Sequence, residues 1–169
     1  MMRGKQRDER SPDRGPVRRR DARGASAVEF AIVVIPLLYL VFGVISYGYM
    51  LSFRQAISQG AAEGARAAAI APVGLTSAEL KTRARDAVND ALGSYDVACT
   101  SAERLVRNGN DAGSCVISDR RTCTSGTANA MCVQVALDYT YSSDSLLPDV
   151  GFGYVLPDHL AYTSEVQVS

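Results

Sequence analysis

Glu29 is the residue of this chain whose type and position most clearly imply a chemical role. It is a single carboxylate at the entrance to an uncharged run that extends from Phe30 to Phe53. A charged side chain at the centre of a bilayer costs up to about 3 kcal/mol, and acids in such places usually have a specific partner. We therefore expect Glu29 to pair with a cation.

A cation for Glu29 would arise if the chain were cut after Gly24. The neighbouring residues Ala25, Ser26 and Ala27 are small, which lets a peptidase accommodate the backbone. Cleavage would free the α-amine of Ala25 and make Glu29 the fifth residue of the mature chain. That amine is largely protonated at neutral pH, since its ordinary pKa is about 8.

The uncharged run predicts a membrane span. Between Glu29 and Arg54 lie 24 residues without a charge, and about 20 suffice to cross a hydrocarbon core as a helix. A conventional secretory signal, with an apolar core of about 7 to 15 residues, fits this run less well. The buried central helix of a soluble protein is the other alternative, and the length disfavours it.

The charge distribution predicts the orientation. Residues 1–24 carry nine Lys and Arg against four Asp and Glu, a net charge of +5, and the rest of the neutral chain carries −5. Basic flanks stay in the cytoplasm, so the acidic part should lie outside. A basic arm can also bind nucleic acid or anionic lipid. Its interspersed acids, Pro12 and Pro16, and its lack of aromatic residues favour a disordered topology signal, so no nucleic acid partner is expected.

The four cysteines lie in the part that follows the span, where about 100 residues remain for one small domain. In an oxidising compartment they predict two disulfides, which supplement a thin core. No metal or cofactor is expected, because there is no CxxC pair and His159 is the single histidine. Of three possible pairings we favour the sequential one, because each bridge would close a local loop. The bridges would be Cys99 with Cys115 and Cys123 with Cys132.

The helix of the span should continue outside the membrane. Residues 54–72 are rich in alanine and reach Pro72 without another proline, which predicts a helix from Ala27 to Ala71. Pro36 should bend this helix or loosen one turn, because proline removes a backbone donor.

Small residues on this helix offer a surface for close packing. Gly43 and the pair Gly60-xxx-Gly64 have the spacing that lets another helix approach within a membrane. The outer part of this surface could equally pack against the protein's own sheet. The sequence leaves both alternatives open.

A second helix is predicted after Pro72. Thr76 and Glu79 have the spacing of a capping box, and Gly93 is placed to end the helix as a left-handed cap. Its inward face should consist of Leu80, Ala84, Ala87, Val88, Ala91 and Leu92.

The remaining chain has the period of strands. Residues 132–141 alternate between apolar and polar side chains, and residues 160–168 suggest a final strand less cleanly. Short strands joined by loops should fill the interval between Cys99 and Cys132, with a loop at 108–113, and residues 146–153 suggest another connection. Helices followed by an antiparallel sheet predict an α+β fold. The expected layout is a cleaved leader at 1–24, a transmembrane helix at 25–53, its extension at 54–72 and a disulfide-containing α+β domain at 73–169.

The segment from Gly24 to Phe30 resembles the type IV prepilin processing site in its tight-adherence (Flp) form, where cleavage after glycine precedes a Glu-Phe pair. Pro36, Gly43 and the runs 54–56 and 63–69 resemble the TadE-like family of pilus assembly proteins. These are minor pilins or pseudopilins with a pilin-like arrangement of helix and sheet. The resemblance covers roughly residues 23–71.

The resemblance implies a subunit that acts in assembly, in the cytoplasmic membrane of a bacterium. Its partners would be a prepilin peptidase, other pilus subunits, inner-membrane assembly proteins and the lipid bilayer. Glu29 would pair with the Ala25 amine of an adjacent subunit. An enzyme acting on a small molecule is not expected, because the sequence has no nucleophile elbow and no phosphate loop. The alternative is a signal-anchored binding or receptor domain outside a pilus.

Overall fold

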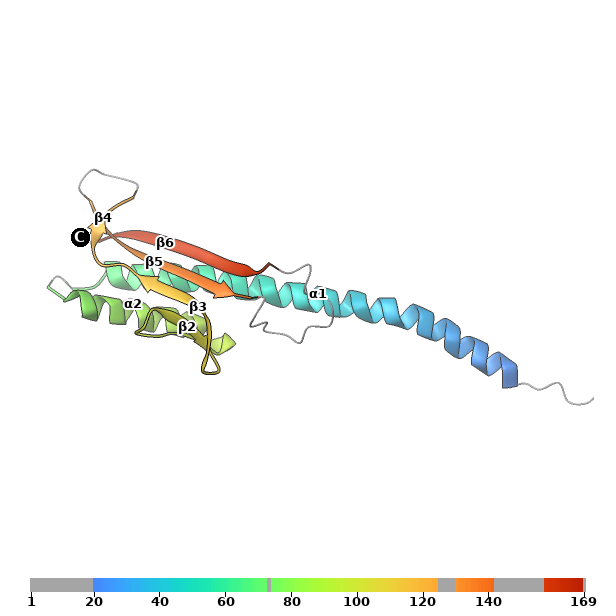
Figure 1. Cartoon of the computed structure of the whole chain (residues 1–169). Coiled ribbons are helices and arrows are strands. Elements are labelled where there is room, and N and C mark those ends of the chain that lie inside the picture. The colour runs from blue at the N-terminus through green and yellow to red at the C-terminus, as the bar shows by residue number, and fades with distance from the viewer. Residues whose placement is uncertain (1–19, 73, 125–129, 142–156, 169) are drawn as a thin grey trace, which may run out of the picture. The chain divides into compact units, whose positions relative to one another are not determined.

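The computed structural model describes residues 20–72, 74–124, 130–141 and 157–168, with side chains from Gly24 onward. Two helices come first, α1 (Arg20–Ala69) and α2 (Ser77–Leu92), and then a 3-10 turn, η1 (Gly93–Tyr95). The strands are β1 (Val97–Cys99), β2 (Arg104–Arg107), β3 (Asn110–Ile117), β4 (Arg121–Thr122), β5 (Met131–Thr140) and β6 (His159–Val168). This order confirms the predicted α+β fold (Figure 1). The expected connection at 146–153 and most of the expected leader lie outside the described residues.

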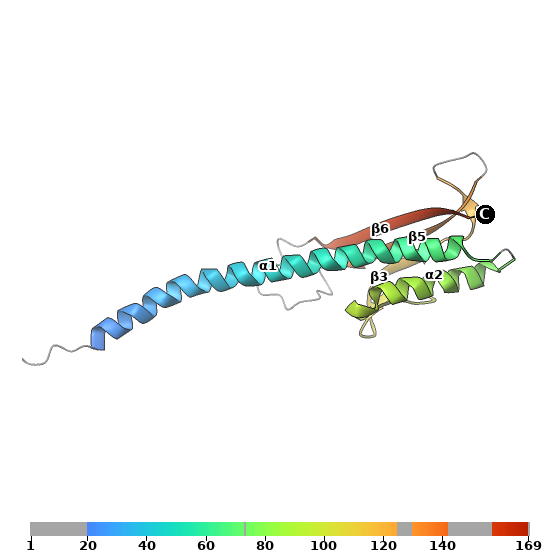
Figure 2. The same cartoon turned by 180° about the vertical axis from the view of Figure 1, so that it is seen from behind.

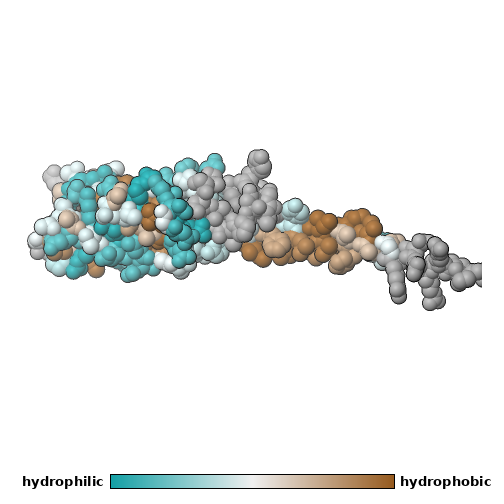
Figure 3. Space-filling view, turned by 60° about the horizontal axis from the view of Figure 1, so that its bottom comes forward, coloured by the Kyte–Doolittle hydropathy of each residue, from teal (hydrophilic) through white to brown (hydrophobic). Residues whose placement is uncertain are grey.

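The chain divides into two compact units, residues 1–41 and 42–169, and the boundary falls inside α1. From Gly24 onward α1 is long and apolar enough to cross a membrane. Figure 3 shows its apolar side chains exposed at the surface. The helix begins at Arg20, earlier than the predicted Ala27, and continues through Pro36 without interruption.

In the second unit, the outer part of α1 and the whole of α2 cover one face of the sheet (Figures 1 and 2). The buried residues of α1 follow one stripe at helical spacing, which is what a helix packed on one side requires. They are Met50, Phe53, Ala56, Ile57, Gly60, Ala61, Gly64, Ala65 and Ala68.

Helix α2 has the predicted start and inward face. Thr76 and Glu79 form the capping box: the Glu79 N–H donates to the Thr76 hydroxyl, and the Thr76 N–H donates to the Glu79 carboxylate. Its fully buried residues are Leu80, Ala84, Val88 and Leu92, and the predicted inward residues Ala87 and Ala91 are half-buried. This face packs against α1 and the sheet.

The predicted left-handed cap at Gly93 is wrong. Gly93 has a φ of −58° and begins η1, so the chain continues as a 3-10 turn over three residues. The left-handed residue is Asp96, with a φ of 57°, and its N–H donates to the Gly93 carbonyl. Aspartate is among the residues that most readily adopt this conformation, so the reversal takes place one turn later than expected.

Strand β5 is the centre of the antiparallel sheet. It pairs with β6 along its whole length, and β3 and β4 share its other edge. The predicted alternation is confirmed: Val133, Val135, Leu137, Tyr139 and Tyr141 are buried under the helices. On β6, the same face is buried only near its ends, and Tyr162 is 46% exposed. As an edge strand, β6 is covered incompletely.

The region 108–113 is a hairpin, where the sequence predicted a loop. Asn108 and Gly109 have positive φ and form its two-residue turn, as this dipeptide favours. Strand β3 begins directly afterwards at Asn110, so the predicted loop is too long. Gly113 is needed for close approach, because a Cβ there would collide with the carbonyl oxygen of Asp138 on β5.

Helices α1 and α2 approach each other closely at Gly64. A Cβ on Gly64 would lie 2.7 Å from Cγ2 of Val88 and 3.1 Å from the carbonyl oxygen of Ala84. At Gly60 the nearest atom, the Cβ of Ala91, would lie at 3.5 Å, an ordinary contact. The two glycines share one stripe but differ in the space they leave.

We therefore predict opposite effects of alanine at these two positions. Gly64→Ala should lower the free energy of unfolding by roughly 1 to 3 kcal/mol, because α2 must shift to admit the methyl group. Gly60→Ala should leave it unchanged or raise it by up to about 1 kcal/mol, because alanine favours the helix. Urea unfolding of the full-length protein in detergent, followed by circular dichroism, measures both. Equal stability of the two variants would contradict the packing at Gly64.

Candidate functional site

The predicted processing segment lies entirely within α1. Gly24, Ala25, Glu29 and Phe30 are all exposed, and Phe30 as a whole residue is 69% exposed. No other part of the described chain comes within 4 Å of the position of a Cβ on Gly24. The segment is thus exposed, and its backbone is helical.

Glu29 and Ala25 lie on one face of α1, because residues four apart in a helix are neighbours. Among the described residues, Glu29 forms no ion pair within the chain. A neighbouring helix that contacts Ala25 would also contact the Glu29 carboxylate. The geometry accordingly leaves this carboxylate available to a group from outside the chain.

Exposed apolar side chains surround α1 on all sides over residues 28–51. Most of the large exposed apolar residues of the described chain belong to this segment, and Ile70, Val116, Met131 and Tyr162 are the others. A helix that is apolar all round is suited to lipid or to other helices. Pro36 is exposed and Gly43 half-buried within this segment.

Gly60 and Gly64 do not belong to that exposed surface. Gly60 faces Leu92 of α2 and Leu137 of β5, and Gly64 faces Val88 of α2. Of the two alternatives that the sequence left open, the structure places these glycines against the protein's own domain. Gly48, earlier on α1, is exposed.

The four cysteines form two bridges in the sequential pairing. Cys99, the last residue of β1, bonds to Cys115 of β3, with Cα atoms 5.7 Å apart. Cys123, which follows β4, bonds to Cys132 of β5, with Cα atoms 4.9 Å apart. Each bridge ties together strands that are close in the sequence. They stabilise the domain chiefly by restricting the unfolded chain on the entropic account.

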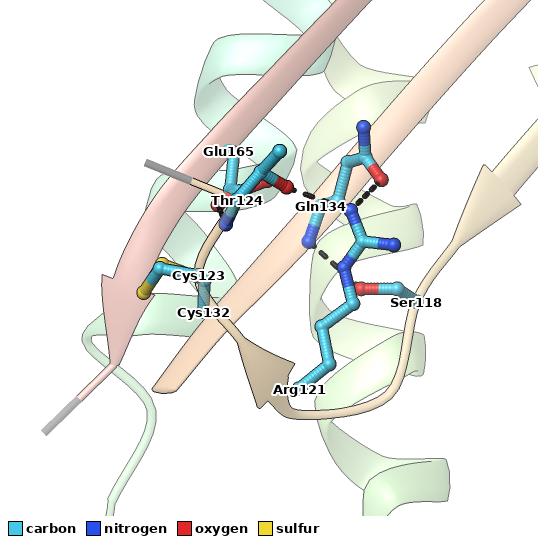
Figure 4. Close-up of polar contacts among 7 residues, drawn as sticks. All are labelled: Ser118, Arg121, Cys123, Thr124, Cys132, Gln134 and Glu165. Atoms are coloured by element: carbon cyan, nitrogen blue, oxygen red, sulfur yellow. Dashed lines mark hydrogen bonds and ion pairs between the residues drawn. A yellow bond between two sulfur atoms is a disulfide. The ribbon is translucent and has the colours of Figure 1, made fainter. Parts of the chain in front are cut away.

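A polar cluster lies beside the second bridge, on the strands β4, β5 and β6 (Figure 4). Thr124 donates its N–H and its hydroxyl to the Glu165 carboxylate, over 2.6 and 2.7 Å. Arg121 hydrogen-bonds to Gln134 and lies 3.4 Å from Glu165. These contacts connect β4 to β6 across β5, and the Thr124 hydroxyl and N–H hold the pKa of Glu165 below its ordinary value.

The same place brings together side chains that could serve as metal ligands. The sulfurs of Cys123 and Cys132 and a carboxylate oxygen of Glu165 lie within 4.8 Å of one another. Both sulfurs are bonded in the disulfide, so neither can act as a thiolate ligand. Thr124 and Arg121 already engage the carboxylate. The arrangement therefore favours a structural cluster over a metal centre.

Two contacts of the domain were missed from the sequence. The ring of Phe53 packs on Tyr95 and Tyr139, with centroids 5.0 and 4.7 Å away, and so joins α1, η1 and β5. The Asn89 side chain accepts the N–H of Cys99 and so holds α2 to the edge strand β1. Neither contact has a signal in the sequence, because the partners lie on elements far apart along the chain or on opposite sides of a turn.

We predict that Glu165 stabilises the domain in a pH-dependent manner. Its folded-state pKa is depressed, so its contribution is complete above the ordinary pKa of 4.5 and is lost as the pH falls through the folded value. Glu165→Gln should lower the melting temperature at pH 7, and the difference from the wild type should shrink below pH 4.5.

Thermal unfolding at a series of pH values checks this prediction. Glu63→Gln is the matched control, because Glu63 is an exposed acid whose nearest cation is Arg66, 3.7 Å away. Such a surface pair contributes little, so this variant should differ little from the wild type at any pH. A constant difference between Glu165→Gln and the wild type across the acid range would contradict the electrostatic account.

Comparison with known proteins identifies the N-terminal helix. The family model described as TadE-like protein matches residues 24–66, which span the processing segment, the apolar part of α1 and most of its outer part. No curated protein and no solved structure matches the chain. The match relates the chain to proteins associated with tight-adherence (Tad) pili. The resemblance predicted from the sequence is confirmed over this range: residues 24–66 match the model of the TadE-like family.

Proposed function

We propose that this protein is a minor pilin-like or pseudopilin-like subunit that takes part in the assembly of a tight-adherence pilus. It is processed by a prepilin peptidase after Gly24. The observation that carries the proposal is that the TadE-like match begins at Gly24, the same residue at which small neighbours predict cleavage. The exposed apolar helix and the disulfide-bonded α+β domain support an assembly role over a catalytic one.

The membrane arrangement in this proposal follows from charge. The arm with a net charge of +5 stays in the cytoplasm, α1 crosses the inner membrane once, and the domain lies outside. Two disulfides in the outer domain support this orientation, since such bonds persist in oxidising compartments.

Processing requires a local change in α1. A peptidase acts on an extended backbone, whereas Gly24 lies inside the helix. Glycine in a helix interior is less stable than alanine by roughly 0.5 to 1 kcal/mol, so the first turns of α1 open more easily there than elsewhere. In this proposal Gly24 has two roles. It places no side chain next to the scissile bond, and it lowers the stability of the helix at that point.

Cleavage creates the charge that Glu29 needs. The new amine of Ala25 carries a positive charge at neutral pH, and Glu29 of an adjacent subunit pairs with it in the membrane. A single charge in lipid is unfavourable, whereas a pair is less so. The pairing therefore favours one register of neighbouring helices.

The contact between subunits uses the apolar segment 28–51 of α1. Gly60 and Gly64 are occupied by α2 and β5 of the same chain, so they cannot receive a neighbour's helix without opening the domain. The exposed segment contains Gly43 and Gly48, where a second helix can approach closely. Assembly in this proposal leaves the fold of the outer domain unchanged.

We predict that the mature chain begins at Ala25 in cells that contain the cognate peptidase. Gly24→Leu should leave the uncut precursor in the membrane, because the side chain obstructs the peptidase. Gly48→Leu is the matched control, since Gly48 is an exposed glycine of the same helix with open space around it, and it should be cut normally. Intact-mass measurement of the purified protein distinguishes the two forms. A mature protein that retains residues 1–24 would exclude processing at this site.

We further predict that Glu29→Gln is cut and inserted but fails to join other pilus subunits. Loss of the pair leaves the amine unpartnered, and incorporation should fall tenfold or more, which corresponds to about 1.4 kcal/mol. Co-purification with pilus components is the measurement, and Glu63→Gln is the control at an exposed acid of the same helix. Normal incorporation of Glu29→Gln would remove the pairing role, and failure of the wild type to co-purify would favour a signal-anchored receptor.

A further inference from the structure

A groove opens on the outer domain between α1 and the edge strand β6. It has a volume of about 350 Å³. Leu51, Arg54 and Ser58 line it from α1, and Leu160 and Tyr162 line it from β6. Its wall therefore combines apolar side chains with a guanidinium, a hydroxyl and a phenol. This mixture suits a ligand that has a charged part and an apolar part.

Arg54 is the cation of this groove, and it is not neutralised by the described part of the chain. Its side chain is exposed and forms no ion pair with a described acid. The other arginine in the outer part of α1, Arg66, lies 3.7 Å from Glu63. An unpaired guanidinium beside an apolar wall favours an anionic partner, which it can bind through two parallel hydrogen bonds.

The position of Arg54 in the sequence indicates where the groove lies relative to the membrane. It is the first charged residue after Glu29, and the 24 residues between them exceed the roughly 20 that cross a hydrocarbon core. A charge is excluded from that core, so Arg54 marks the outer end of the span. The groove thus opens at the level of the lipid headgroups on the side of the domain.

Exposed tyrosines support the placement of the groove at the membrane–water interface. Tyr47 and Tyr49 of α1 are 51% and 37% exposed, and Tyr162 in the groove is 46% exposed. Tyrosine is enriched where a membrane meets water, because its ring is apolar and its hydroxyl is polar. Two of these rings precede Arg54 by less than two turns of helix, and the third lines the groove itself.

We propose that this groove binds the headgroup of an anionic phospholipid from the outer leaflet, with the Arg54 guanidinium on its phosphate. Leu51 and Leu160 contact the glycerol and the first methylenes, whereas the Ser58 hydroxyl beside Arg54 donates to the Gln55 carbonyl. The groove is too small for a whole lipid, and the acyl chains extend along the exposed apolar side chains of α1. The inference rests on α1 crossing the membrane and does not require the pilus role.

Native mass spectrometry of the full-length protein in detergent tests the proposal. The probes are phosphatidylglycerol and phosphatidylcholine with identical acyl chains, and the quantity measured is the fraction of protein that retains one lipid. The wild type should retain phosphatidylglycerol preferentially. Arg54→Gln should reduce this retention about fivefold, the effect expected of one basic residue at an anionic surface. Arg54→Lys should restore part of it, and Arg66→Gln should retain as much as the wild type.

Three results would overturn the proposal. Equal retention of phosphatidylglycerol by Arg54→Gln and by the wild type would exclude Arg54 as the ligand. Competition by soluble glycerol phosphate at the same concentration as the lipid would identify a free-phosphate site. A lipid-independent dimer that disappears in Arg54→Gln would show that a second copy of the chain occupies the groove. Thermal unfolding of each variant checks that the exposed substitutions leave the fold intact.

Discussion

The outer domain depends on the close approach of α1 and α2 at Gly64. With no side chain on α1 at this point, Val88 of α2 can reach the helix backbone, and the alternating side chains of β5 fill the space beneath both helices. The same helix is apolar on all sides over residues 28–51 and buries a single stripe above them. The continuous helix α1 is thus suited to two environments. Its first part is suited to lipid or other helices, and its outer part packs on the protein's own sheet. The stripe of small residues is used by the fold, so the proposed assembly would use the exposed segment.

Local patterns predicted the elements, but contacts between distant strands could not be predicted. The capping box at Thr76 and the alternation in β5 depend on residues near each other in sequence, and both are confirmed. The cap at Gly93 failed because an aspartate three residues later takes the left-handed conformation. The Arg121, Thr124 and Glu165 cluster requires the register of three strands and has no sequence signal. Gly60 and Gly64 were ambiguous for a different reason, since small residues permit close packing without specifying the partner. The candidate processing segment could be proposed from the sequence, because such a segment is defined by consecutive residues, and its cleavage stays a prediction.

The helical state of Gly24 adds a physical condition to the proposed processing. A helix that continues through the scissile bond resists a peptidase, and the bond becomes accessible only when the first turns open. Glu29 lies beyond this region, at the entrance to the uncharged part of α1, and remains exposed without an ion pair to any described residue. Before cleavage the carboxylate has no amine to pair with. After cleavage the amine and the acid lie one turn apart on the same face of the helix, so each subunit offers both charges to a neighbour. In the proposed mechanism, processing and pairing are therefore linked by a single chemical event.

Loss of the leader would also change the electrostatics of the whole chain. The precursor is neutral because an arm of +5 balances a remainder of −5, so cleavage leaves the mature protein strongly acidic. An acidic domain is repelled by anionic headgroups, and the repulsion acts within about a Debye length of 8 to 10 Å. Arg54 is the first cation that follows the span, so it is the side chain placed to offset this repulsion where the chain leaves the membrane. Attraction at this one position, combined with repulsion of the rest, would hold the domain upright above the membrane rather than flat upon it. In the proposed assembly, a domain held in this way would present the exposed face of α1 to neighbouring subunits.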